Sequence, residues 1–97
     1  MPTIDEIKEK SKSIFMLYPV KKVTLFGSYA KGTQDTDSDI DFLIKDSDIS
    51  ILATSNLKEQ LSSVLNKKVD ILSESDLSDV FLFLIRDEEV VVYEKQG

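Results

Sequence analysis

The sequence has 97 residues, 41% of them hydrophobic, with a formal net charge of −6 at pH 7 and no cysteine or histidine. A chain of this length buries roughly two thirds of its unfolded surface, so we expect one domain over residues 1–97. Without cysteine and histidine, disulfides, thiolate zinc sites and imidazole catalysis are excluded, which leaves chemistry based on oxygen ligands.

The charge and the apolar runs restrict the partners of the protein. An acidic chain is not expected to bind DNA or RNA directly, because affinity for a phosphate backbone depends mainly on lysine and arginine. The apolar runs at residues 80–85 and 90–93 are far shorter than the roughly 20 residues of a membrane-spanning helix. The N-terminus lacks the apolar core of a signal peptide. We therefore expect a cytoplasmic protein without a membrane segment.

The first 26 residues predict a helix followed by a strand. Thr3 and Glu6 have the spacing of a capping box, and Pro19 forbids continuation of a helix. The first helix should therefore cover about residues 3–17. Residues 22–26 are partly β-branched and lead directly into a glycine, as expected for a strand that enters a turn.

A short helical turn and a second strand should follow. Residues 27–32, GSYAKG, leave room for about one helical turn. Apolar and acidic residues then alternate over residues 39–44, which predicts a strand with one buried face. The buried face carries isoleucine and phenylalanine, so the aspartates should lie on the opposite face.

The second half of the chain continues the alternation of helix and strand. Leucine recurs at every fourth position within residues 50–65, which predicts a helix that Asn66 ends. Residues 67–72 alternate as a strand, residues 73–85 should form a helix, and residues 89–94 should form a last strand. The sequence therefore predicts an α/β fold: a small mixed sheet of about four strands, covered by helices.

The turn after the first strand has the composition of an anion site. Ser28 places a hydroxyl group and backbone N–H groups at the start of a short helical turn, where phosphate can bind. Glycine and serine are also ordinary turn residues, and Gly32 can simply end the turn. The turn by itself therefore leaves both interpretations open.

Two aspartates on the second strand indicate a metal site. Asp39 and Asp41 project from one strand face and repel each other unless a cation intervenes. Mg²⁺ and Mn²⁺ prefer such oxygen ligands, although an isolated pair also describes a solvated strand end. Asp70, on another predicted strand between apolar Val69 and Ile71, favours the metal site because two strands then converge on it.

These residues together resemble a known family. The pattern G-S-x3-G-x5-S-D-x-D, formed by residues 27–28, Gly32 and residues 38–41, is followed by Asp70. This combination resembles the nucleotidyltransferase superfamily, which includes DNA polymerase beta and kanamycin nucleotidyltransferase. The chain length is similar to that of minimal nucleotidyltransferases (MNT), usually encoded beside a HEPN-domain partner, and the resemblance extends over residues 22–93.

The resemblance implies a nucleotidyltransferase fold and roles for seven residues. The residues that would act in catalysis and ligate metal are Asp39, Asp41 and Asp70. The residues that would bind nucleotide are Gly27, Ser28, Lys31 and Ser38. The expected cofactor is Mg²⁺, as two ions for which Mn²⁺ can substitute, and the expected substrate is ATP. Family members often carry arginine where this chain has Tyr29 and Lys31.

The resemblance also implies a partner and a reaction. An MNT antitoxin of this kind would form a hetero-oligomer with a HEPN ribonuclease toxin and transfer AMP from Mg-ATP to a tyrosine hydroxyl of the toxin. Residues 80–85 are apolar nearly all round, which fits either a face covered by another chain or a wide core stripe. Two alternatives are neutralisation of the toxin by contact alone, and a free-standing transferase that modifies a small hydroxylated molecule such as an aminoglycoside.

Overall fold

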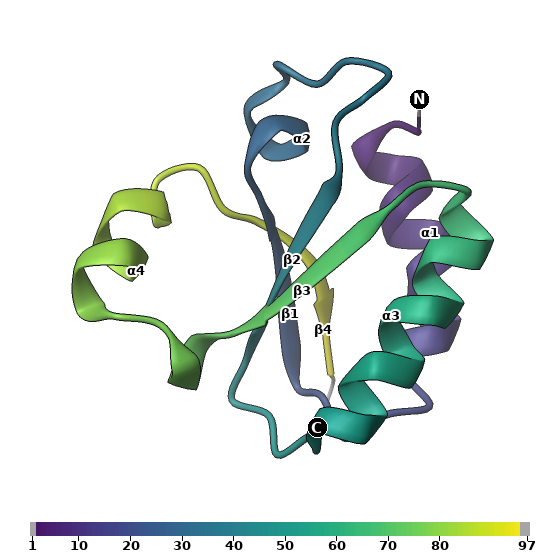
Figure 1. The fold of residues 1–97 in the computed structure, drawn as a ribbon, viewed down its shortest axis with the longest axis vertical. Coiled ribbons are helices and arrows are strands. Elements are labelled where there is room, and N and C mark those ends of the chain that lie inside the picture. The colour runs from purple at the N-terminus through teal and green to yellow at the C-terminus, as the bar shows by residue number, and fades with distance from the viewer. Residues whose placement is uncertain (1, 96–97) are drawn as a thin grey trace.

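The computed structural model describes residues 2–95 (Figure 1). Helices and strands alternate along the chain as the sequence predicts. The helices are α1 (Ile4–Phe15), α2 (Ser28–Lys31), α3 (Ile51–Leu65) and α4 (Asp79–Ile85), with a 3₁₀ turn η1 (Glu74–Asp76). The strands are β1 (Lys22–Phe26), β2 (Ile40–Lys45), β3 (Val69–Ser73) and β4 (Val90–Glu94). The expected α/β class with a four-stranded sheet is confirmed.

The sheet has the strand order β3-β2-β1-β4 and is mixed. β1 pairs antiparallel with both β2 and β4, whereas β2 and β3 run parallel and are connected through α3. Parallel strands need such a long crossover connection. Because of this arrangement, the first residues of β2 and β3 lie side by side at the same end of the sheet.

One face of the sheet is covered by α1 and α3, which lie together on one side in Figure 1. Three leucines of α3, Leu57, Leu61 and Leu65, are buried against the sheet, as their fourfold spacing predicts. The N-terminus of α1 is fixed by the predicted capping box between Thr3 and Glu6. This packing forms the main core and gives the sheet a rigid base.

The opposite face of the sheet carries α4 and a smaller apolar cluster. Phe26, Leu43 and Ile85 are its buried members. The sequence predicts a helix over residues 73–85, but the structure begins α4 at Asp79, after η1. The physical reason is the cap, since the Ser78 hydroxyl accepts a hydrogen bond from the Phe81 N–H at 3.1 Å and starts the helix there.

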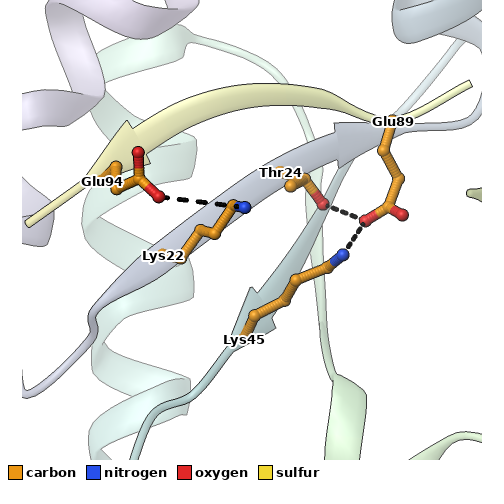
Figure 2. Close-up of polar contacts among 5 residues, drawn as sticks. All are labelled: Lys22, Thr24, Lys45, Glu89 and Glu94. Carbon is orange, nitrogen blue, oxygen red and sulfur yellow. Dashed lines mark hydrogen bonds and ion pairs between the residues drawn. The ribbon is translucent and has the colours of Figure 1, made fainter.

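Polar contacts connect β4 and the segment before it to the centre of the sheet (Figure 2). Lys22 of β1 pairs with Glu94 at 3.8 Å. Glu89, directly before β4, accepts a hydrogen bond from the Thr24 hydroxyl and pairs with Lys45 of β2, both at 2.8 Å. The C-terminal strand is therefore held by side chains as well as by its backbone pairing with β1.

No helix within residues 2–95 has both the length and the apolar character needed to cross a membrane.

Candidate active site

The site begins with two aspartates that lie opposite each other on parallel strands. Asp41 of β2 is in register with Asp70 of β3. Neighbouring strands are about 4.8 Å apart, and side chains alternate between faces. Both carboxylates therefore start from the face that carries Leu43 and Leu72, and Asp70, on the edge strand, still lies within reach of Lys58 of α3. Asp39 precedes β2 by one residue, so all three predicted carboxylates lie at one end of the sheet.

Burial and neighbouring charges raise the pKa of the Asp41 carboxyl, which lies between Asp39 and Asp70 in the candidate site. Burial, followed by the nearby charges of Asp70 and Asp39, raises the pKa of Asp41 from 3.8 to about 6. Burial disfavours the charged form, and like charges disfavour it further. A divalent cation among these oxygens would relieve the repulsion. The donor set therefore fits Mg²⁺ or Mn²⁺ by its chemistry.

Lysines pair with the two outer carboxylates. Lys58 Nζ of α3 lies 3.5 Å from Asp70 Oδ1, and Lys68 Nζ lies 3.7 Å from Asp39 Oδ2. Within residues 2–95, no three carboxylates converge closely enough to hold one ion together. Both lysines are about half or more exposed, and such surface pairs are weak, so the outer carboxylates can turn inward toward a cation.

The segment after β1, residues 27–32, is called the glycine turn here. Gly27 has a φ of +76°, and a methyl group on its Cα would collide with Asp41 Oδ2. The turn therefore contacts the central carboxylate directly, and glycine allows the close approach. Ser28 is the first residue of α2, so it directly follows the glycine that contacts Asp41.

The other predicted nucleotide-binding side chains have partners within the protein. Ser38 donates its hydroxyl hydrogen to Asp35 Oδ1 at 3.2 Å and accepts from the Asp35 N–H at 3.0 Å, so it stabilises its own loop. Lys31 Nζ lies 3.3 Å from Glu88 Oε2. Tyr29 is fully buried in the main core. Of positions 29 and 31, only position 31 is exposed enough to contact a ligand.

The contact of Glu88 with the glycine turn could not be predicted from the sequence. Glu88 Oε1 accepts a hydrogen bond from the Gly27 N–H at 3.2 Å, across 61 positions of sequence. A glutamate directly before a strand reads as an ordinary solvated residue. The pairing depends on where the segment between α4 and β4 folds, which no local period or turn residue indicates.

The family comparison assigns a class to this arrangement. The description "Polymerase beta, Nucleotidyltransferase" belongs to a family model that matches residues 9–97. The chain therefore belongs to the polymerase beta nucleotidyltransferase family, as the predicted resemblance requires.

Two relatives match almost the whole chain. A Methanocaldococcus jannaschii protein named "Putative protein adenylyltransferase MJ0435" is 38% identical over 90 residues, which cover 92% of this chain and 97% of that protein. "Protein adenylyltransferase MntA" of Thermococcus cleftensis is 31% identical over 97 residues, covering 95% and 98% respectively. The relatives are therefore of similar length, and both names describe transfer of AMP to protein.

Solved structures share the fold. A chain of a toxin-antitoxin crystal structure with AMP-PNP has a TM-score of 0.75 and 25% identity, covering 92% of this chain and 74% of that one. A chain of the Shewanella oneidensis complex of tri-AMPylated HEPN toxin with MNT antitoxin has a TM-score of 0.73 and 21% identity, covering 97% and 75%. The second likeness supports the fold alone.

The raised pKa of Asp41 predicts a pH-dependent cost in stability. The charged form is disfavoured in the folded state, so stability is lost as pH rises from about 4 to about 6. Asp41→Asn should leave unfolding at pH 4 nearly unchanged. At pH 7.5 it should add about 1 kcal/mol after a discount for solvent screening, or roughly 4 °C in melting temperature. Thermal melts at both pH values test this. Exposed Asp37→Asn is the control, and an equal gain there would contradict the prediction.

The contact between Gly27 and Asp41 predicts a difference between two glycine substitutions. Gly32 has the same φ of +76°, but nothing lies within 4 Å of a methyl group there. Gly32→Ala should lower stability by about 1 kcal/mol through its left-handed backbone. Gly27→Ala should lower stability by more than that, because its φ of +76° and ψ of −155° suit glycine alone and the methyl group would meet Asp41 Oδ2. Gly27→Ala alone should also displace Asp41 and weaken Mn²⁺ binding, measured by calorimetry. Equal metal affinity of the two variants would show that the contact is unimportant.

Proposed function

We propose that this protein is an antitoxin that transfers AMP from Mg-ATP to a tyrosine hydroxyl of a HEPN toxin. The observation that carries the proposal is the register of Asp41 with Asp70 beside the contact of Asp41 with Gly27. The names of the relatives support protein adenylylation. The toxin-antitoxin structure with AMP-PNP, at 25% identity, supports the partner class and the nucleotide, whereas the tyrosine and the HEPN identity of the partner follow from the family resemblance.

The proposed site has one side that would bind the nucleotide and another that would face the acceptor. Asp39 and Asp41 would hold divalent ions, and Gly27 with Ser28 would bind the β- and γ-phosphates through backbone N–H groups and the hydroxyl. Asp70, on the edge strand, would face the acceptor and favour removal of the phenolic proton. Bound Mg²⁺ would neutralise the negative charges of the phosphates. Lys31 adds a point charge without the bidentate geometry of arginine.

The transfer itself is a single displacement. The tyrosine oxygen forms a bond to the α-phosphorus of ATP while the bond from that phosphorus to the bridging oxygen of the β-phosphate breaks. Pyrophosphate leaves with the electron pair of the broken bond, and the phenolic proton passes to solvent by way of Asp70. The product is an AMP ester on the toxin. Such a reaction requires the acceptor to be held in line, which contributes several kcal/mol to catalysis.

An exposed apolar face on α4 supports a protein partner. The sequence left open whether the apolar run of this helix belongs to the core or to an interface. The structure divides the helix, because Ile85 is buried in the small cluster whereas Val80, Phe83 and Leu84 have exposed fractions of 69%, 59% and 70%. Adjoining exposed apolar side chains of this kind mark interaction sites. The toxin would cover this face and present its tyrosine to Asp70.

The same face also supports neutralisation of the toxin by contact alone, and a double variant separates the two functions. Asp39→Ala with Asp41→Ala should abolish AMP transfer, because no other group replaces the carboxylates, while the α4 face stays intact. We expect wild-type protein with Mg-ATP to add one or more AMP masses to the toxin in intact-protein mass spectrometry and to suppress its ribonuclease activity. The double variant should do neither. Full suppression by the double variant without added mass would establish the contact mechanism.

The α4 face predicts a binding defect without a folding defect. Phe83→Asp places a charge in the proposed interface and should weaken toxin binding by about tenfold or more. Because Phe83 is exposed, the melting temperature of the free protein should hardly change. Ile51→Asp on α3 is the matched control, since Ile51 is 91% exposed and α3 lies apart from α4. Affinity is measured by calorimetry, and an equal loss in both variants would remove α4 from the interface.

A further inference from the structure

The segment between α4 and β4 contains two adjacent glutamates that point to different parts of the protein. Glu89 contacts the sheet through Thr24 and Lys45, as Figure 2 shows. Glu88 contacts Gly27 and Lys31, the residues at the two ends of α2. The neighbouring carboxylates therefore have separate structural effects, although they are chemically identical.

Glu88 holds both ends of the glycine turn with one carboxylate. Oε1 accepts the Gly27 N–H at 3.2 Å, and Oε2 lies 3.3 Å from Lys31 Nζ. The turn is closed by its own hydrogen bond from the Lys31 N–H to the Gly27 carbonyl at 3.1 Å. The Glu88 side chain is only 19% exposed. A carboxylate largely removed from water makes stronger and better directed hydrogen bonds than an exposed one.

The position of Gly27 in turn sets the geometry beside Asp41. Gly27 packs so closely on Asp41 Oδ2 that a methyl group would not fit between them. A shift of the Gly27 backbone would therefore move the glycine turn relative to the central carboxylate. Glu88 holds the Gly27 backbone in place by accepting its N–H hydrogen bond. It acts on the site through Gly27 and needs no contact with the nucleotide itself.

We propose that Glu88 is a positioning residue for nucleotide transfer, which keeps the glycine turn at the right distance from Asp41. This inference rests on the proposed transferase function. The opposite possibility is a placeholder, in which the carboxylate merely occupies an anion site until ATP displaces it. The two ideas predict different results when Glu88 is removed. Loss of a placeholder would strengthen ATP binding, whereas loss of a positioning residue would slow AMP transfer.

Three variants distinguish these effects. Glu88→Ala removes both contacts, Glu88→Gln keeps an oxygen that can accept the Gly27 N–H, and Glu89→Ala is the matched control in the same segment. Misplacement by about 1 Å can cost about 100-fold in rate, so we expect a loss of that order in kcat for Glu88→Ala. Glu88→Gln should retain most of the rate. Glu89→Ala should lower the melting temperature while keeping kcat within about twofold, since its contacts lie in the sheet.

A measurement without ATP, metal or toxin tests the contact separately. The sequence has three glycines, so ¹⁵N-glycine labelling gives a simple amide spectrum in which hydrogen exchange of Gly27 can be followed. Exchange at Gly27 should accelerate about tenfold or more in Glu88→Ala, as expected when an amide loses its hydrogen bond. It should stay slow in Glu88→Gln and Glu89→Ala, with Gly32 as the internal reference.

The two readouts separate failure of this inference from failure of the proposed function. If wild-type protein transfers no AMP, the proposed function fails, while the exchange experiment still tests the contact. Glu88→Ala with a wild-type rate, or with tighter binding of Mg-ATP, would overturn the positioning role. Unchanged exchange at Gly27 would overturn it as well. If Glu88→Ala does not fold, Glu88→Asp replaces it, because the shorter side chain withdraws the carboxylate while keeping the charge.

Discussion

The candidate site depends on the parallel pairing of β2 with β3. This pairing sets Asp41 directly beside Asp70, although 29 positions separate them in sequence. An antiparallel pairing would place the starts of the two strands at opposite ends of the sheet. The crossover through α3 makes the parallel arrangement possible, and the three buried leucines of α3 hold it against the sheet. A packing interaction on one face therefore brings charged groups together on the other.

That arrangement has an electrostatic cost which the core must offset. Partial burial of Asp41 disfavours its charged form, and the charges of Asp70 and Asp39 disfavour it further. Directly behind them, Ile40, Phe42 and Val69 are buried in the main core, so the strands cannot separate without exposing these side chains to water. The repulsion between the carboxylates therefore persists in the folded protein, and a bound cation would neutralise it. This is a common relation between stability and function at catalytic sites.

The sequence was informative wherever a local period or turn residue determined the structure. The alternation over residues 39–44 correctly predicted which side of β2 faces the main core, and the fourfold leucines predicted α3. The expectation of a single buried face was wrong, because Leu43 on the other side is buried in the smaller cluster with Ile85 of α4. The sequence was also wrong about the start of α4, because serines and acids fit a capped 3₁₀ turn as well as a first helical turn. It could not predict the lysines beside Asp39 and Asp70, or the Glu88 contact, because these depend on the packing of distant segments. The carboxylates could be found from residue type, spacing and strand pattern, whereas their counterions could not.

One short segment joins the exposed apolar side of α4 to the glycine turn. Glu88 follows the last residue of α4, Ile85, by three positions, and Ile85 is buried in the same cluster as Phe26, the residue before Gly27. The exposed apolar side of α4 and the carboxylate that holds the glycine turn therefore belong to one continuous stretch of chain. A partner that covered α4, as proposed above, would restrict the motion of this stretch and, through Glu88, of the glycine turn. The proposed binding of a partner and the proposed positioning of the glycine turn would therefore depend on the same short segment.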